Sequence, residues 1–519
     1  MSSASPRFVA AGGKKNSEKL AAVGIWILIA YAIVRNLLAA VATRFWCDEV
    51  WTAIMARQFS ASTVWKALAL AADGQPPPFY FVERAAAALT PNVQIGLRLP
   101  SILGFACTLL CVFTFIRRRS GGVIALVCAA IMLPTVLFDP YATDARPYSM
   151  VVACLALALV CYQRSPESRW VIAMGLSLLA AGALHYFAVF AFVPFGLAEI
   201  AWTLKARALR INVWLALASG LLPLALFWPL LRRLKQVYGS DVWGLRTLRD
   251  ATASYGWFFH VPQHYWRLGI DAVVVLLLLG ALVALAFPNA RRAWMAEPLF
   301  HEHVLTLALL ALPFVTYTAT RLAGSGFQYS HVLAAVVAIP LGLGYIFPRV
   351  NRVAVPLLAI FILGVLGIQE ARFWPSRQSG MAQLVPPVDS IETLATLAGR
   401  PDLPVVVSGG GEFTPIVYYA SPAWAKRFVF VTDPSAAIQY TNTSNMDKNL
   451  LVESSLYPPF QVYEFPAFAR EHSSFLLYSN GSPQDWWPRR LLHGGYSLKL
   501  AAADGGLEIY FVTRNETSP

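Results

Sequence analysis

The chain has 519 residues, of which 57% are apolar and 13% are charged, and its mean hydropathy is +0.54. Ordinary soluble proteins carry about 25% charged residues, so this composition excludes a soluble enzyme, a disordered scaffold and a secreted disulfide-rich module. The net charge of +13 does not indicate nucleic-acid binding, because Lys and Arg fall in short runs between apolar segments, where they orient helices in a bilayer. The composition therefore predicts a polytopic α-helical membrane protein.

The first apolar segment runs from Leu20 to about Thr43 and follows a polar, basic stretch at residues 1–19. A cleaved signal peptide is an alternative, because Ala40-Val41-Ala42 resembles a small-residue cleavage site. However, the segment is longer than the apolar part of a signal peptide, about 7–15 residues, and long enough to span a bilayer. We therefore expect an uncleaved first helix whose N-terminal tail, 1–19, is cytoplasmic.

Further apolar segments follow, so that about eleven spans are predicted in total. The turns that would share a side with the N-terminus are all basic, as the positive-inside rule requires; they are 117–119, 164–169, 205–210, 291–292 and 349–352. The further spans are predicted at roughly 97–116, 121–138, 147–163, 169–185, 187–204, 211–230, 268–287, 303–320, 328–347 and 353–370.

One apolar segment, from Pro77 to Leu89, is not predicted to span. It is shorter than the roughly 20 residues that a span needs, and Glu83-Arg84 lies in its middle. A charge at mid-bilayer costs at least ~2.5–3.5 kcal/mol. We expect a juxtamembrane helix within an outer loop, 44–96.

The composition changes after about Ala371, where short β-branched runs alternate with turn residues and helix-like stretches. This pattern predicts an extracytoplasmic α/β domain over 373–519. Gly409–Gly411 lacks the GxGxxG spacing of a nucleotide site, so a tight turn is expected there. The predicted strands are 404–407, 428–431, 475–478 and 507–512.

Chemically interesting residues gather in the predicted outer loops. Asp48-Glu49 follows the first span and opens a short amphipathic stretch, where the bland alternative is an acidic first helical turn. The other segments are Gln75-Pro76-Pro77-Pro78-Phe79-Tyr80, Leu97-Arg98-Leu99-Pro100-Ser101, Asp144-Ala145-Arg146-Pro147-Tyr148 and His185-Tyr186.

In order and spacing, these segments resemble the GT-C fold glycosyltransferases that use polyprenyl-phosphate sugars. Within that group they are similar to the bacterial branch of protein O-mannosyltransferases and of the aminoarabinose transferase acting on lipid A. The family pattern has an acidic pair after the first helix, a Pro-Pro segment ending in Tyr, Leu-Arg-Leu-Pro-Ser at a helix start, an acidic-Ala-Arg loop and a later His-Tyr. The resemblance covers roughly 20–210 well and the later spans loosely. No single motif is specific, but five in this order are.

The resemblance implies a GT-C catalytic domain over 20–372 in the bacterial inner membrane, which moves a sugar from a polyprenyl phosphate to a lipid, glycan or protein on the outer face. It implies that Asp48 is the general base of one inverting displacement, with Glu49 either sharing the site or solvated. Arg146 would hold the departing phosphate, because a guanidinium matches phosphate geometry, and Asp144 would position Arg146 or contact the sugar. The further donor-binding candidates are Gln75, Arg98, His185, Tyr186, Arg321, Tyr329 and His331.

Two positions depart from the family pattern. Gln75 stands where the family has His or Lys, and Gln328-Tyr329 stands where it has Arg-Tyr. Both changes remove a positive charge, so contacts with the donor phosphate are expected to shift to Arg146, Arg321 or the basic loop 231–267. No cofactor is predicted; a divalent cation at Asp48 and Glu49 is only an alternative, because no further ligand has suitable spacing.

The outer loop 231–267 is basic and aromatic. One interpretation is a lid over the donor, with Trp257, Phe258 and His260 as its candidate contacts. The other is an interfacial belt of aromatic side chains and arginines at the lipid headgroups, which explains the same composition. The sequence does not choose between them.

Other functions remain as alternatives. A transporter or lipid flippase predicts repeated halves and ionisable residues at mid-membrane, and neither is evident. An oligosaccharide polymerase or ligase would place its key Arg and His in one late outer loop, which 231–267 allows, but it does not account for Asp48-Glu49 or for Asp144 and Arg146. A purely structural membrane protein explains none of these clustered charges.

Overall fold

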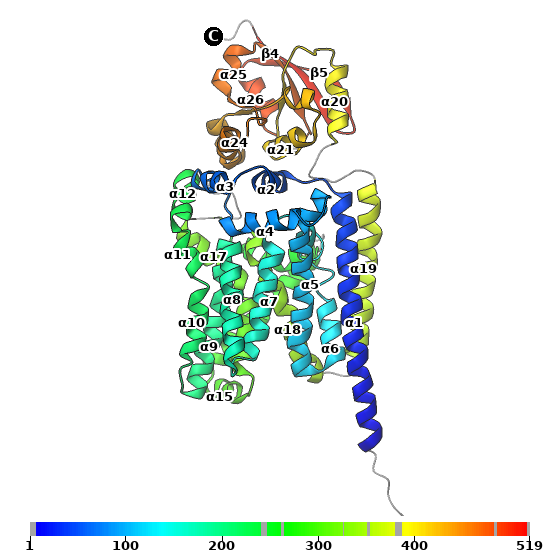
Figure 1. The fold of residues 1–519 in the computed structure, drawn as a ribbon, viewed down its shortest axis with the longest axis vertical. Coiled ribbons are helices and arrows are strands. Elements are labelled where there is room, and N and C mark those ends of the chain that lie inside the picture. Colours follow the sequence, from blue (N-terminus) through cyan, green and yellow to red (C-terminus); the bar gives the residue numbers. More distant parts are fainter. Residues whose placement is uncertain are drawn as a thin grey trace, which may run out of the picture. The chain divides into compact units, whose positions relative to one another are not determined.

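The computed structural model describes residues 7–239, 247–260, 264–324, 326–349, 353–378, 387–481 and 485–515. It is mainly helical, with one sheet near the C-terminus (Figure 1). The chain forms two compact units. The first, which we call the membrane unit, comprises Met1–Val41, Gln75–Trp228 and Gly244–Phe373; the second, the sheet unit, comprises Ala42–Gly74, Pro229–Trp243 and Trp374–Pro519.

The membrane unit contains five helical stretches that are long and apolar enough to cross a bilayer, among the residues that the structure describes. Two bent pairs raise the number to seven: Asp271–Val283 with Pro288–Ala296, and Phe300–Leu310 with Leu312–Ala323. Two shorter apolar helices are α7 (Tyr148–Gln163) and α8 (Ser168–Leu184). The protein is therefore a multi-pass helical membrane protein, as predicted. The five stretches are Asn16–Ala42, Val93–Ser120, Tyr186–Ala206, Tyr329–Ile346 and Ala354–Arg372.

By length and composition, this count is smaller than the eleven spans predicted, because glycine and proline interrupt several apolar segments. In the segment predicted at 121–138, helix α6 (Gly122–Ala130) ends before Pro134, and turns follow. The segment predicted at 211–230 is divided at Gly220 and before Pro229. Proline has no N–H to donate and its ring clashes with the preceding turn. The pieces of the second segment are α10 (Ile211–Ser219), α11 (Leu222–Leu226) and α12 (Trp228–Tyr238).

The other elements of the membrane unit include the helix predicted over 77–89, which is α4 and is too short to span. Residues 231–267, predicted as a loop, contain helical residues of α12 and α13 in their described part. The bounds are α1 (Arg7–Ala42), α4 (Pro77–Ala87), α5 (Val93–Ser120), η1 (Tyr141–Thr143), η2 (Tyr186–Ala191), α9 (Phe192–Ala206), α13 (Leu248–Phe258), α14 (His264–Ala286), α15 (Pro288–Ala296), α16 (Phe300–Leu310), α17 (Leu312–Ala323), η3 (Tyr329–Val337), α18 (Ala338–Ile346), η4 (Phe347–Arg349) and α19 (Ala354–Gln378).

Buried ion pairs tie distant helices of the membrane unit together. On α1, Arg35 pairs with Asp139 at 2.8 Å and with Glu370 of α19 at 3.0 Å. Glu302 of α16 and Glu199 of α9 are both fully buried, and they pair with Arg119 and Arg210, respectively. Removing one partner of a buried pair leaves an uncompensated charge, so these pairs fix which helices are neighbours. The tie between α1 and α19 agrees with their adjacent course in Figure 1.

The sheet unit is built on a six-stranded sheet in the order β3-β2-β1-β4-β6-β5. Strands β3, β2, β1 and β4 are parallel, and β6 is antiparallel to both β4 and β5. The four predicted strands are β1 (Val405–Val407), β2 (Phe428–Thr432), β4 (Ser474–Ser479) and β6 (Leu507–Arg514). Two strands were not predicted, β3 (Val462–Glu464) and β5 (Tyr496–Asp504).

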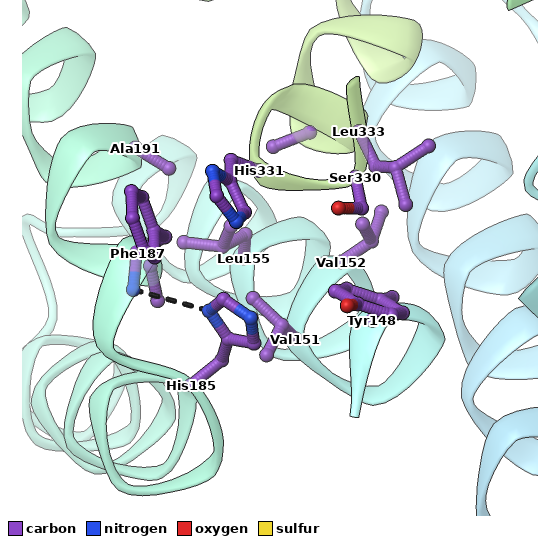
Figure 2. Close-up of a pocket in the computed structure, with 12 residues that line it drawn as sticks. Tyr148, Val151, Val152, Leu155, His185, Phe187, Ala191, Ser330, His331 and Leu333 are labelled. Carbon is purple, nitrogen blue, oxygen red and sulfur yellow. Dashed lines mark hydrogen bonds between the residues drawn. The ribbon is translucent and has the colours of Figure 1, made fainter. Parts of the chain in front are cut away.

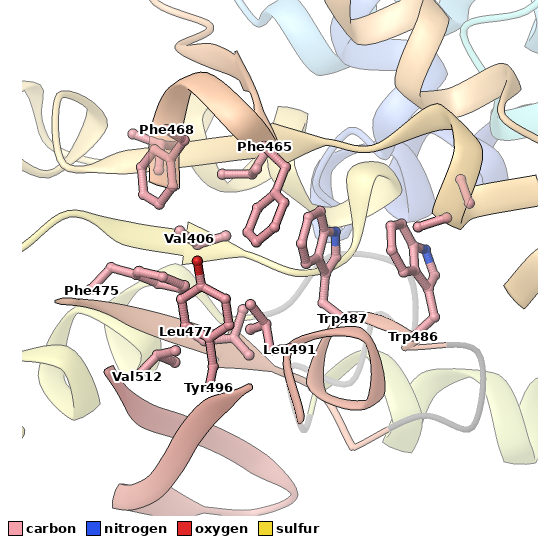
Figure 3. Close-up of a cluster of buried hydrophobic side chains, with 14 residues drawn as sticks. Val406, Phe465, Phe468, Phe475, Leu477, Trp486, Trp487, Leu491, Tyr496 and Val512 are labelled. Atoms are coloured by element: carbon pink, nitrogen blue, oxygen red, sulfur yellow. The ribbon is translucent and has the colours of Figure 1, made fainter. Parts of the chain in front are cut away.

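The core of the sheet unit joins strand residues to aromatic side chains from the covering helices. Val406 and Leu477 on neighbouring strands face Phe465 and Phe468 of α25 and Trp487 of α26 (Figure 3). Burial of such large apolar side chains contributes roughly 1.5–3 kcal/mol each. The helices are α2 (Cys47–Arg57), α3 (Ala61–Ala69), α20 (Val388–Leu397), α21 (Gly410–Tyr419), α22 (Pro422–Ala425), α23 (Pro434–Thr441), α24 (Asn445–Leu456), α25 (Phe465–Glu471) and α26 (Trp487–His493).

The glycine run at 409–411 is not a tight turn, which corrects the prediction. Gly409 is the N-cap of α21, and Gly410 and Gly411 form its first turn. A Cβ on Gly410 would lie only 2.3 Å from Cγ of Met446 on α24. The glycine is therefore required by the close approach of these two helices.

Candidate active site

The acidic pair Asp48-Glu49 lies in the first turn of α2, in the sheet unit. Glu49 is 1% exposed, and its Oε2 accepts a hydrogen bond from the backbone N–H of Trp46 at 3.3 Å, which caps the helix. Asp48 precedes it and is only half-buried. Negative charge is stabilised near a helix N-terminus. Of the two carboxylates, Glu49 is thus engaged in the fold, and Asp48 has the greater access to an incoming hydroxyl.

Most side chains of helix α2 are buried, so it is not an exposed surface helix. Trp51 is almost fully buried, and its ring lies 5.8 Å from Phe59 and 6.4 Å from Phe460. Just before α2, the backbone N–H of Phe45 donates to the hydroxyl of Tyr419 at 2.7 Å. These contacts hold the first turn of α2, and hence Asp48, in a fixed orientation relative to the sheet unit.

The loop with Asp144 and Arg146 connects η1 to α7 in the membrane unit. Both side chains are buried, with 8% and 4% exposure. Ser101 on α5 donates from Oγ to the carbonyl of Arg146 at 2.9 Å, which fastens the loop to α5. Gly104 allows this approach, because a Cβ there would lie 2.9 Å from the backbone N of Met150. An acid and a guanidinium are therefore held inside the membrane unit by close packing of α5 against α7.

A small pocket next to this loop brings together two candidate histidines, His185 and His331 (Figure 2). Their rings are 5.8 Å apart, and Tyr148 lies 5.3 Å from His185. The volume of about 20 Å³ is enough for one water molecule. The lining residues are Tyr148, Val151, Val152, Leu155, His185, Phe187, Ala188, Ala191, Ser330, His331, Leu333 and Ala334.

The orientation of both histidines is set by Phe187. Its backbone N–H donates to Nδ1 of His185 at 3.1 Å, so neutral His185 carries its proton on Nε2. Its ring stacks on His331 at 3.5 Å and 14°. Within the described part of the chain, the buried Nδ1 of His331 has no hydrogen-bond partner. Phe187 thus fixes both imidazole rings in the wall of the pocket.

An aromatic chain extends from this pocket to the candidate lid. Trp257 of α13 stacks on Tyr329 at 4.9 Å and lies 5.9 Å from Tyr141, which in turn lies 5.1 Å from Tyr148. Phe258 is fully buried, and its carbonyl accepts from the N–H of Val136 at 2.9 Å. The structure therefore joins residues that are far apart in sequence, from η1, α7, α13 and η3.

His260 follows α13 and has a positive φ of 51°. Burial lowers the pKa of its imidazole; Asp139 opposes this shift, and Arg35 adds to it. A neutral His260 can accept a proton or a hydrogen bond at neutral pH.

The remaining predicted site residues differ in their burial and in their contacts. Arg98 is buried and donates from Nη1 to the carbonyl of Ala40 at 2.8 Å, which joins α5 to the end of α1. Gln75 is buried, and its Oε1 has no hydrogen-bond partner among the described residues. Tyr186 is buried in η2, whereas Arg321 is exposed in the last turn of α17.

Three pocket residues, Tyr148, Phe187 and Ser330, were not named as binding candidates from the sequence. Two of them stood inside the motifs themselves, directly after Arg146-Pro147 and after His185-Tyr186. Ser330 lies between Tyr329 and His331, and no sequence signal separated it from them. In the described part of the chain, no group of three or more His, Cys, Asp or Glu side chains is placed to hold a metal ion.

Comparison with known proteins supports the fold over nearly the whole chain. The structure of ArnT from Cupriavidus metallidurans in the apo state matches with a TM-score of 0.56 and 13% identity, over 95% of this chain and 98% of that one. The same protein bound to undecaprenyl phosphate matches with a TM-score of 0.53 and 13% identity, over 94% and 98%. No protein-family model and no curated protein matches the sequence.

These matches show that the chain has the GT-C fold, a polytopic helical unit followed by a C-terminal α/β unit, as the sequence predicted. The fold is therefore of the same class as that of the proteins whose motif pattern identified the candidate residues.

Proposed function

We propose that this protein is a membrane glycosyltransferase that moves a sugar from a polyprenyl-phosphate donor to a lipid, glycan or protein acceptor on the outer face of the bacterial inner membrane. The observation that carries the proposal is the match, over 95% of the chain, to a fold that has been solved with undecaprenyl phosphate bound. It is supported by the burial of Asp144 and Arg146 and by the joining of His185, Tyr329 and His331 in one region of the membrane unit.

The reaction divides between a proton acceptor and groups that hold the leaving phosphate. The acceptor hydroxyl loses its proton to Asp48, and its oxygen attacks the anomeric carbon as the bond to the phosphate breaks. The departing polyprenyl phosphate is a phosphate monoester whose second pKa is about 6, so it needs no strong acid. One displacement of this kind inverts the anomeric configuration.

Arg146 is proposed to hold the departing phosphate, because its two parallel N–H groups match two phosphate oxygens. Asp144, two residues earlier, positions Arg146 or contacts the sugar. His185 is proposed to contact the donor, and Tyr329 and Trp257 supply an aromatic surface for a sugar ring or the isoprenoid. Gln75, with its buried Oε1, can accept from a sugar hydroxyl.

The test is to incubate the purified full chain with a panel of polyprenyl-phosphate sugars and a membrane extract as the source of acceptors. Release of free polyprenyl phosphate from one donor, with label transferred to an acceptor, is the expected result. Asp389→Asn is a control that should leave the rate unchanged, because Asp389 is 92% exposed. If no donor is consumed and none binds, the proposal is wrong.

A further inference from the structure

An arginine-lined hollow lies in the membrane unit, away from the candidate active site. It has a volume of about 820 Å³, within the range of ligand sites. The end of α5, the start of α1, the residue after α7 and η4 contribute to it. Its lining residues are Glu18, Thr114, Arg117, Arg118, Arg119, Ser120, Gly121, Arg164 and Pro348.

Two of the four arginines in this hollow are already neutralised. Arg117 donates from Nε to Glu18 at 2.9 Å. Arg119 is paired with the buried Glu302, with Nε at 3.0 Å from Oε2. Glu18 also accepts from the backbone N–H of Gly122 at 2.6 Å, so its carboxylate is fully engaged between α1 and α6.

The other two guanidinium groups, Arg118 and Arg164, have no acidic partner among the residues that the structure describes. Arg118 is exposed. Arg164 lies over the ring of Trp170 at 4.4 Å, and its buried Nε makes no hydrogen bond to any described residue. A buried donor without a partner is costly. Among the described residues, the hollow therefore holds two positive charges that have no acidic partner.

The position of the hollow relative to the bilayer follows from the apolar helical stretches that end beside it. The apolar stretch of α1 begins at Asn16, next to Glu18, and that of α5 ends at Ser120, next to Arg117–Arg119. The hollow thus lies where two helices leave the apolar layer, at the level of the lipid headgroups. Val123, close by on α6, is 48% exposed and offers an apolar surface to an acyl chain.

We propose that this hollow binds the phosphate of an anionic phospholipid through Arg118 and Arg164. The positive-inside rule explains why arginines occur at these helix ends, but it requires neither a hollow nor two unpaired guanidiniums facing it. Basic pockets between transmembrane helices are suited to acidic lipid headgroups, and Arg matches two phosphate oxygens at once. The site involves none of the candidate active-site residues, so it stands independently of the proposed function.

The test uses the purified full chain in mixed micelles of phosphatidylcholine with a rising mole fraction of phosphatidylglycerol. Bound lipid is counted by native mass spectrometry, and the melting temperature is followed in parallel. We expect phosphatidylglycerol to be retained and to raise the melting temperature of the wild type. Because each arginine near a charged headgroup contributes about 1 kcal/mol, Arg118→Gln and Arg164→Gln should each weaken binding about fivefold, and the double variant about 25-fold.

Arg292→Gln is the matched control, because Arg292 is exposed on α15 and lies outside the hollow. Its affinity for phosphatidylglycerol should equal that of the wild type. Equal affinity in the double variant and the control would overturn the proposal. In a competition experiment, inorganic phosphate is added at a millimolar concentration to the protein with bound phosphatidylglycerol. If inorganic phosphate displaces the bound lipid as well as added phosphatidylglycerol does, the ligand is a soluble phosphate and the proposal is also overturned.

Discussion

In the membrane unit, Glu199 and Glu302 are fully buried and each is paired with an arginine, whereas in the sheet unit Asp485 and Glu412 are held by neutral donors. Asp485 accepts from the hydroxyls of Ser408 at 2.7 Å and Ser479 at 2.5 Å. Glu412 accepts from the side-chain amide of Asn480.

Buried carboxylates in the two units therefore have different kinds of partner. In the membrane unit, a carboxylate paired with an arginine joins two helices, so it contributes to structure. In the sheet unit, burial has the largest effect and raises the pKa of both Asp485 and Glu412, while the hydrogen bonds from neutral donors lower it. Asp48, in contrast, is half-buried in the first turn of α2. Substitutions can therefore show which carboxylates act in stability and which in chemistry.

The largest effect is expected for Asp48→Asn. A positioned general base contributes about 10²–10⁴-fold to a rate, so transfer should fall by that factor, about 3–5.5 kcal/mol of barrier. The measurement is kcat with saturating donor. The melting temperature should fall by only about 1–2 °C, because a negative charge in the first turn of a helix such as α2 is worth about 0.3–1 kcal/mol. Normal transfer by this variant would remove Asp48 from its role.

The opposite result is expected for Glu302→Gln, which should lower stability and leave the chemistry intact. Breaking a buried ion pair costs about 3–5 kcal/mol, and the lower end applies because Arg119 is 25% exposed. The measurement is the melting temperature in detergent, with kcat measured well below it. Glu297→Gln, at an exposed glutamate, is the control. A variant as stable as this control would show that the pair does not hold α5 to α16.

A smaller effect, on donor binding, is expected for Arg146→Lys. Lysine keeps the charge but loses the two parallel N–H donors, and hydrogen bonds to charged groups are worth about 1.5–3 kcal/mol. We expect kcat/KM for the donor to fall about 10- to 100-fold, mainly through KM. Arg292→Lys should change nothing. If the loss fell only on kcat, Arg146 would act on the transition state rather than on the bound donor.

The smallest effect is a pH dependence of stability in the sheet unit. Because burial raises the pKa of Glu412, the folded protein binds this proton more tightly than the unfolded chain does. The protonated Glu412 therefore contributes to stability below the pKa of the unfolded chain. This contribution is lost as the pH rises through the raised pKa of the folded protein. Relative to the wild type, Glu412→Gln should become more stable as the pH rises from 4 to 8.

Thermal unfolding of both proteins at several pH values measures this trend, with Glu471→Gln, at an exposed glutamate, as the control. A difference between wild type and Glu412→Gln that does not change with pH, or that changes in the opposite direction, would contradict the assigned environment.

Local patterns in the sequence were sufficient for much of the fold. Strands β1, β2 and β6 followed from β-branched runs and β4 from the apolar run 475–478, and the short α4 followed from its length and its central charges. Strand β3 has a single β-branched residue, Val462, and Ala501–Ala503 hide the alternation of β5, so neither carried a usable signal. Among the described residues there are fewer long apolar helices than the eleven predicted spans, because hydropathy does not record where a helix breaks, as at Gly220 and Pro229.

The sequence predicted individual residues of the candidate site but not the contacts between them. The motifs identified His185 and His331. The stacking of the Phe187 ring on His331 depends on tertiary packing, so the sequence could not predict it. The role of Arg98, which joins α5 to α1, is also tertiary, whereas the cap made by Glu49 on α2 is local and agrees with the acidic first turn that the sequence offered as an alternative. No spacing rule in the sequence distinguishes such a structural contact from a ligand contact.

The most direct test of sugar transfer by a single displacement is the anomeric configuration of the product. A polyprenyl-phosphate donor labelled with ¹³C at the anomeric carbon is incubated with the purified chain and the membrane extract, and the product is examined by NMR. We predict a product whose anomeric configuration is opposite to that of the donor. A product with the donor's configuration would contradict the single displacement with Asp48 as base.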